Sequence, residues 1–173
     1  MKALCLLGIG LVMTVPAIAA EDSQPFSCED SAVHRAFDFW VGDWDVYVDG
    51  ELRSRSIISR RQNGCLIHEN YNSLSGWHGE SMNFVDPATG KWRQVWVDQD
   101  AGLVTYEGEF RDGAMRMHGR WTFRDGRYEL ARVSWTELPD GGVEHKLEHS
   151  KDEGKSWYLF FLGLYRPHGE GGE

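Results

Sequence analysis

The chain has 173 residues, enough for one domain with a sizeable core, and its 27 acidic and 18 basic side chains give a formal net charge of −9 at pH 7. An acidic protein repels nucleic acid and anionic lipid, so both are excluded as expected partners. Charges of both signs are mixed along the chain, which is typical of a solvated surface.

Residues 1–20 have the features of a secretory signal peptide. Lys2 gives a positive start, residues 3–15 are almost continuously apolar, and Ala17-Ile18-Ala19 forms an A-x-A cleavage signal. An anchor helix is the alternative, but the apolar run is shorter than the ~20 residues that span a bilayer. We therefore expect a periplasmic or secreted protein, with one domain at 21–173 and no integral membrane segment after processing.

Two cysteines follow this leader, Cys28 and Cys65. In an exported protein an isolated pair is most simply a disulfide, which here would tie the N-terminal segment to an early strand. A metal-binding or catalytic cysteine is the alternative, but no Cys-x-x-Cys or Cys-x-x-His spacing supports it.

The first regular element that the sequence predicts is a helix of one or two turns around 29–38. Ser27 is its candidate N-cap, and Asp30 is an acidic residue in its first turn. The aromatic stretch F-D-F-W-V-G-D-W-D-V-Y follows at 37–47. It is too aromatic for a loop and too interrupted for a regular helix.

Short segments rich in aromatic and β-branched residues then alternate with turn signals such as Asp49-Gly50 and Asn63-Gly64. Because all the links are short, we expect an antiparallel meander, and closure into a barrel would remove its two edges. The predicted fold is thus an all-β, up-and-down barrel with a short N-terminal helix. It has about ten strands, expected near 43–49, 51–60, 65–73, 79–86, 91–98, 103–110, 114–123, 127–137, 142–150 and 155–165.

The last of these strands, W-Y-L-F-F-L-G-L-Y, is apolar on both faces. One face would point into the barrel. The other would contact either the N-terminal helix or another subunit, which leaves room for a homodimer.

Residues 150–157, S-K-D-E-G-K-S-W, match the Asp-box pattern S-x-D-x-G-x-S-W of sialidase propellers. A propeller needs repeated copies, and this chain has one. We interpret the motif as a stabilised hairpin turn, in which the Asp152 carboxylate accepts backbone N–H groups, Gly154 takes a positive φ and Trp157 packs beneath.

His145 and His149 have a spacing that would suit a metal site in a helix, but they fall in a predicted strand. There, residues four apart lie ~13 Å apart, too far to share one zinc ion unaided. No metal site or cofactor is therefore expected, and both residues are interpreted as polar groups on a barrel wall. A haem or metal role for either histidine is the alternative.

Three stretches resemble a family of exported bacterial proteins that is grouped as a domain of unknown function and assigned a lipocalin-like barrel. They are F-D-F-W-V-G-D-W-D-V-Y, N-G-C-L-I-H-E-N-Y and G-E-S-M-N-F-V-D-P-A-T-G-K-W-R-Q-V-W-V-D. The resemblance runs from about Phe37 to Arg166, and it supports a fold more than a function.

Gly42-Asp43-Trp44 also resembles the G-x-W start of lipocalins and related calycin barrels. That resemblance implies that Trp44 plugs the closed end of the barrel and that Arg166, from the last strand, stacks over it in a cation–π contact. Phe37, Phe39 and Trp40 would seal the same end. The alternative is that this aromatic stretch contacts a ligand.

Several predicted strand faces mix large aromatic rings with polar groups, as the walls of small-molecule pockets do. We expect such faces to line a cavity in which Arg132 pairs with Glu69, because a buried charge needs a partner. The reverse orientation would turn Val95 and Val97 inward and leave two tryptophans of the same strand facing solvent. The candidate ligand-binding residues are Glu69, Tyr71, Trp92, Gln94, Trp96, Trp121, Arg132, His145 and His149.

Three functions remain open on the sequence. The first is an exported binding protein for a small hydrophobic or amphipathic ligand, of which a haem site in a ten-stranded, nitrobindin-like barrel is a special case. The second is an enzyme with Glu69 or His145 as general base. The third is an envelope or interaction protein whose barrel is filled by its own side chains.

Overall fold

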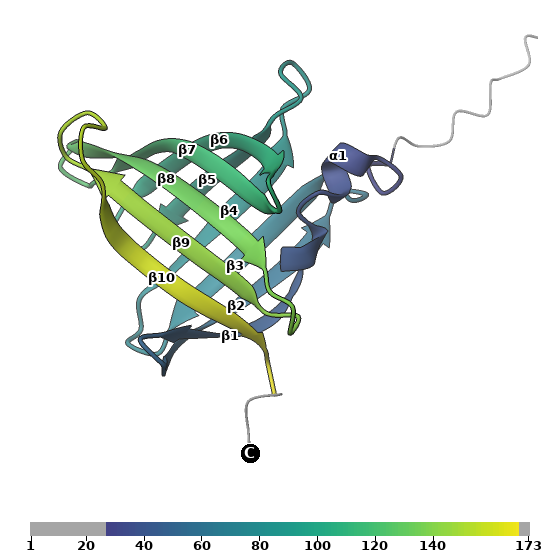
Figure 1. Cartoon of the computed structure of the whole chain (residues 1–173), viewed down its shortest axis with the longest axis horizontal. Coiled ribbons are helices and arrows are strands. Elements are labelled where there is room, and N and C mark those ends of the chain that lie inside the picture. Colours follow the sequence, from purple (N-terminus) through teal and green to yellow (C-terminus); the bar gives the residue numbers. More distant parts are fainter. Residues whose placement is uncertain (1–26, 170–173) are drawn as a thin grey trace, which may run out of the picture.

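The computed structural model describes residues 27–169, which form a closed antiparallel β-barrel (Figure 1). Each strand pairs with its neighbours in the sequence, and β1 pairs with β10 to close the barrel. The strands are β1 (Gly42–Val48), β2 (Glu51–Arg61), β3 (Leu66–Ser73), β4 (His78–Val85), β5 (Trp92–Asp98), β6 (Leu103–Arg111), β7 (Ala114–Thr122), β8 (Tyr128–Glu137), β9 (Val143–Ser150) and β10 (Tyr158–Pro167). The predicted ten-stranded, up-and-down barrel is therefore confirmed, while the predicted signal peptide lies outside the described residues.

Only the last strand begins more than one residue away from its expected start. β10 begins at Tyr158, because the Asp-box residues before it form the turn. Asp152 accepts hydrogen bonds from the backbone N–H and the side-chain hydroxyl of Ser156, and these hold the pKa of its carboxyl at about 2. Gly154 has a φ of 87°, and its carbonyl oxygen accepts a hydrogen bond from the Trp157 indole N–H. The motif is thus a stabilised turn, as predicted.

The N-terminal helix is shorter than predicted. It consists of α1 (Ala32–Arg35) and a 3₁₀ turn, η1 (Asp38–Trp40), and its N-cap is Ser31. Ser27 as N-cap was a wrong prediction, since its hydroxyl instead accepts the N–H of Glu29 in a preceding turn. Cys28 explains the late start, because its backbone N–H bonds to the carbonyl of Asn63 and holds this segment against the β2–β3 turn.

A disulfide between Cys28 and Cys65, whose Cα atoms are 5.0 Å apart, fixes the same contact covalently. The N-terminal segment is thereby attached to the end of the barrel that it covers. Among the described residues, no helix is long and apolar enough to cross a membrane.

Residues 37–44 fill this end of the barrel. Phe37 and Trp40 are completely buried, and the Phe37 ring stacks on Trp40 and meets Trp135 edge-on, with ring centroids 4.9 and 5.1 Å apart. The Trp44 indole N–H donates to the carbonyl oxygen of Trp40, which joins the plug to the first strand. We call Phe37, Trp40, Trp44, Trp92 and Trp135 the aromatic plug.

The predicted contact between Trp44 and Arg166 is wrong. Trp44 points into the barrel, whereas Arg166 pairs with Asp140 in the β8–β9 turn. The ring that approaches Trp44 from β10 is Tyr165, at 6.4 Å between centroids. Strand alternation explains the error, because adjacent residues of a strand face opposite sides of the sheet.

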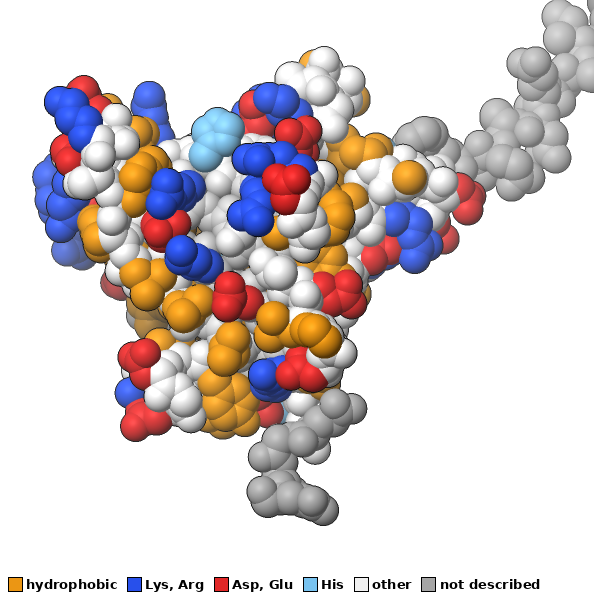
Figure 2. Space-filling model, in the orientation of Figure 1, with side chains coloured by type: hydrophobic (Ala, Val, Ile, Leu, Met, Phe, Trp, Pro, Cys, Tyr) orange, Lys and Arg blue, Asp and Glu red, His pale blue; other side chains and the backbone are white. Residues whose placement is uncertain are grey.

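The outer side of the barrel is a mixed surface. Figure 2 shows acidic, basic and apolar side chains interspersed over the face that carries β7–β10 in Figure 1. Leu159 and Leu162 of β10 are exposed there, because α1 contacts β4 and η1 contacts β8. Of the two alternatives for this face of β10, contact with the N-terminal helix is therefore wrong, and contact with a second subunit stays a prediction.

Candidate functional site

A cavity of about 160 Å³ lies inside the barrel beyond the aromatic plug. Its wall includes side chains from β3, β5, β6, β7, β9 and β10 and from the turn before β4, and it reaches partly exposed positions at Trp77, Trp121 and Phe160. The lining residues are Glu69, Tyr71, Trp77, Gln94, Trp96, Val104, Tyr106, Trp121, His145, Leu147, Phe160, Phe161 and Tyr165.

Alternation along the strands places most of these residues. In β5, Trp92, Gln94 and Trp96 are buried while Val95 and Val97 are exposed, so the orientation with tryptophans inside is the observed one. In β3, Ile67, Glu69 and Tyr71 point inward in the same way.

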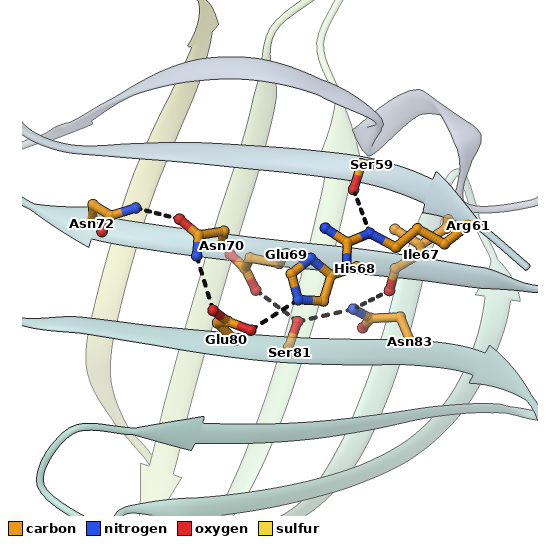
Figure 3. A network of polar contacts seen from close by, with 10 residues as sticks. All are labelled: Ser59, Arg61, Ile67, His68, Glu69, Asn70, Asn72, Glu80, Ser81 and Asn83. Carbon is orange, nitrogen blue, oxygen red and sulfur yellow. Dashed lines mark hydrogen bonds and ion pairs between the residues drawn. The ribbon is translucent and has the colours of Figure 1, made fainter.

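Glu69 is the one carboxylate of the lining, and it sits in a hydrogen-bond network between β2, β3 and β4. Ser56 and Ser81 each donate a hydroxyl to it, at 3.2 and 2.8 Å. Asn83 donates its side-chain amide to Ser81 at 2.9 Å, and Gln94 donates to the Asn83 side-chain oxygen at 2.9 Å. Figure 3 shows Glu69, Ser81 and Asn83 joined on β3 and β4, apart from the separate group in which Glu80 bonds to His68 and Asn70.

Burial shifts the pKa values of the titratable groups that line the cavity. Desolvation raises the pKa of Glu69 to about 7, although its two serine hydrogen bonds oppose the shift. Desolvation lowers the pKa of His145 to about 3, so this ring is neutral at ordinary pH even though the cavity leaves part of it accessible. The pKa values of Tyr71, Tyr106 and Tyr165 are raised for the same reason.

Aromatic rings surround the side of the cavity next to Glu69. Trp77 stacks on Trp96 with centroids 5.7 Å apart, and Tyr71 meets both rings edge-on at 5.9 and 6.0 Å. Gly79 makes room for this arrangement, because a Cβ there would lie 2.3 Å from the Trp96 ring. We call Tyr71, Trp77 and Trp96 the aromatic wall.

A bulge in β10 shapes the opposite side. The register between β10 and β9 shifts between Leu159 and Phe161, and both Phe160 and Phe161 contribute to the lining although they are adjacent. Phe161 meets the His145 ring at 5.2 Å, and Phe160 meets Trp121 at 5.2 Å.

Two polar atoms of the lining are buried without a hydrogen-bond partner in the described part of the chain. They are the Tyr106 hydroxyl and the Trp96 indole N–H. Unpartnered buried polar groups cost free energy, and the indole N–H groups of Trp40 and Trp135 in the aromatic plug are buried in the same way.

Six of the nine candidate residues predicted from the sequence line the cavity: Glu69, Tyr71, Gln94, Trp96, Trp121 and His145. Trp92 instead belongs to the aromatic plug, where its indole N–H donates to the carbonyl of Val33 at 3.0 Å. That any of these residues contacts a ligand stays a prediction.

His149 lies just behind the lining. Its ring is fully buried and stacked on Phe160, with centroids 4.0 Å apart, and its Nδ1 lies 3.1 Å from the Glu129 carboxylate. Burial lowers the pKa of His149, and the Glu129 contact partly offsets that effect.

Arg132 is not in the cavity, so its predicted pairing with Glu69 is wrong. It faces outward, bonds to Glu148 at 2.8 Å and lies 4.5 Å above the ring of Trp157. The inward face of β8 consists of Glu129, Ala131, Val133 and Trp135, all buried. Glu69 has no cationic partner among residues 27–169.

The packing of the barrel histidines does not favour the alternative of a haem or metal role. The His145 ring stacks on Trp135 and the His149 ring on Phe160. Within residues 27–169, no group of three or more His, Cys, Asp or Glu side chains is placed to hold a metal ion.

Sequence reasoning missed several lining residues. Val104 and Tyr106 alternate in β6 as Gln94 and Trp96 do in β5, so the same pattern would have found them. Trp77 lies in a turn, and Phe160 faces inward because of the bulge, so neither follows from alternation.

A scan against protein-family models finds no match to this chain, and a search of curated proteins finds none either.

Proposed function

We propose that this protein binds a small, partly aromatic or amphipathic molecule in the barrel cavity. The observation that carries the proposal is a preformed space whose wall combines aromatic rings with a few convergent polar groups, the usual composition of a small-molecule site. A barrel filled by its own side chains would leave no such space.

The size of the cavity limits the ligand. An engineered apolar cavity of ~150 Å³ in another protein holds benzene, so about 160 Å³ suits one aromatic ring with a short substituent. The Glu69 carboxyl would orient that substituent, while the rings bury the apolar part.

Native mass spectrometry of the mature protein, purified from a bacterial periplasm, tests this proposal directly. We expect an added mass that organic extraction removes, or saturable binding of benzyl alcohol by the extracted protein. Saturable binding should be followed by the fluorescence of the cavity tryptophans.

A matched pair of variants locates the binding. Val104→Trp would fill the cavity and should abolish binding, whereas Leu103→Trp adds the same group at the neighbouring, exposed position and should leave binding intact. A folded Val104→Trp protein that still binds the same molecule would contradict the proposal, and so would a wild-type protein that neither retains nor binds one.

One observation favours an enzyme as the second candidate. A cavity carboxylate with a pKa of about 7 is matched to general-base catalysis near neutral pH, whereas His145, with a pKa of about 3, is a weak base. Turnover of any aromatic test substrate should then inflect near pH 7 and disappear in Glu69→Gln. Activity that survives this substitution would eliminate Glu69 as the base.

A further inference from the structure

The cavity lining can carry negative charge but no positive charge. Its lining contains the carboxylate of Glu69 but no lysine or arginine, and the low pKa of His145 keeps that ring neutral. A molecule inside therefore meets at most one ionised group, and that group is negative.

The Glu69 carboxylate can accept more hydrogen bonds than it receives. A carboxylate accepts ~four hydrogen bonds, and in this structure Ser56 and Ser81 donate one each to its two oxygens. A buried carboxylate without a cation is costly to ionise, and the raised pKa of Glu69 expresses that cost. A cationic group in the cavity would remove the cost by pairing with it.

The aromatic wall favours the same charge. The faces of tyrosine and tryptophan rings attract cations within ~6 Å, most strongly where water is excluded, and clustered aromatic rings are the usual receptors for organic ammonium groups. Tyr71 and Trp96 are both buried, and Tyr71 follows Glu69 on the inner face of β3. An anionic ligand would face repulsion from Glu69, and a neutral one would leave the pairing with Glu69 unused.

We propose that the ligand of this cavity is a small organic monocation, an aromatic or alkyl ammonium compound whose charged group lies between Glu69 and the aromatic wall. The inference rests on the proposed binding function and names the ligand class of the same site. The apolar remainder of the ligand would point toward Leu147 and Phe161.

Isothermal titration calorimetry with three probes of similar shape tests the assignment. At pH 8, benzylammonium should bind the oxidised, mature protein at least ~10-fold more tightly than benzyl alcohol, and benzoate should bind more weakly than either. Equal affinities for benzylammonium and benzyl alcohol would overturn the cation assignment and leave the binding function standing. Failure of all three probes to bind would count against both.

Two charge-removing variants sharpen the result. Glu69→Gln keeps the shape of the side chain and should reduce the preference for benzylammonium over benzyl alcohol by at least ~10-fold. Glu80→Gln removes the same charge on the outer face of the adjacent strand and should leave the preference unchanged. Benzyl alcohol binding reports whether each variant is folded, and an unaltered preference in Glu69→Gln would overturn the assignment.

The pH dependence of the wild-type protein gives an independent test without a variant. The other titratable groups that line the cavity with Glu69 are Tyr71, Tyr106, Tyr165 and His145, and their shifted pKa values keep all of them neutral between pH 5 and 8. Alkylammonium groups also stay protonated there, since they titrate near ~10.

Below the pKa of Glu69, benzylammonium affinity should therefore fall by up to ~10-fold per pH unit while benzyl alcohol affinity stays constant. An affinity for benzylammonium that does not change between pH 5 and 8 would overturn the assignment.

Discussion

The two halves of the barrel interior are built from the same kinds of residue, but one half is filled by side chains and the other surrounds a cavity. At the plug end, Phe37, Trp40 and Trp135 are buried against one another and leave no space. In the other half, Tyr71, Trp96 and Tyr106 surround a cavity and share its wall with Glu69.

The two halves differ because side chains from a segment outside the barrel fill only the plug end. Phe37 and Trp40 come from a segment outside the barrel, which the disulfide at Cys28 ties to the β2–β3 turn. In the opposite half the cavity is lined by strand residues and by Trp77 of the β3–β4 turn, and polar groups stand between the large rings of the wall. Aromatic content alone therefore does not distinguish a core from a site, whereas polar atoms between the rings do.

Truncation of a plug residue should lower stability the most, and so it tests the difference between the two halves most directly. Trp40→Ala removes a fully buried ring and leaves a void, so we expect it to lower the free energy of unfolding by about 3–5 kcal/mol. Trp121→Ala only enlarges a cavity that already exists and should cost about 1–2 kcal/mol. Urea unfolding of the oxidised proteins measures both, and equal losses would mean that the two halves are packed alike.

Glu69 should make stability depend on pH. Its pKa is raised from 4.5 to about 7 on folding, so the native state binds more protons than the unfolded state between these values. Its stabilising contribution is complete below pH 4.5 and is lost as pH rises through 7, by up to ~3 kcal/mol.

The measurement is the difference in unfolding free energy between the wild type and Glu69→Gln from pH 4.5 to 8. Residues that both proteins share, including the histidines, cancel in this difference. We expect the wild type to lose stability relative to the variant as pH rises, and a constant difference would show that Glu69 is not desolvated.

Arg132 should have the smallest effect, because it lies outside. Arg132→Ala removes an exposed ion pair and the contact with Trp157, so it should cost less than ~1 kcal/mol and leave ligand binding unchanged. Loss of benzyl alcohol binding in this variant would mean that a change on the outer face of β8 alters the binding cavity.

Much of the fold follows from local sequence signals. Asp-Gly and Asn-Gly pairs fix the turns, since Asp49, Asn63 and Asp112 adopt positive φ with the glycines that follow them. The spacing of such turns and the period-2 alternation between them were enough to predict the strands and the inward face of β5.

The site was less predictable, because it depends on features that alternation does not encode. In β8, Arg132 and Ser134 make the outer face more polar, and polarity alone was mistaken for a cavity lining. The Glu129–His149 contact joins positions 20 apart on neighbouring strands, so it requires the register of β8 against β9. The inward turn of Phe160 requires the bulge in β10.

The pairing of β1 with β10 has a consequence for how the chain reaches this structure. All other strand pairs join consecutive segments through short turns, but this seam brings together Asp45 and His168, which are 123 positions apart. Contacts between distant positions form slowly, because the intervening chain loses more entropy when they close. We expect the seam to form late in folding, and until then two unpaired strands remain available to neighbouring molecules. The rate of one strand pairing would then decide how long a newly made chain is prone to aggregate.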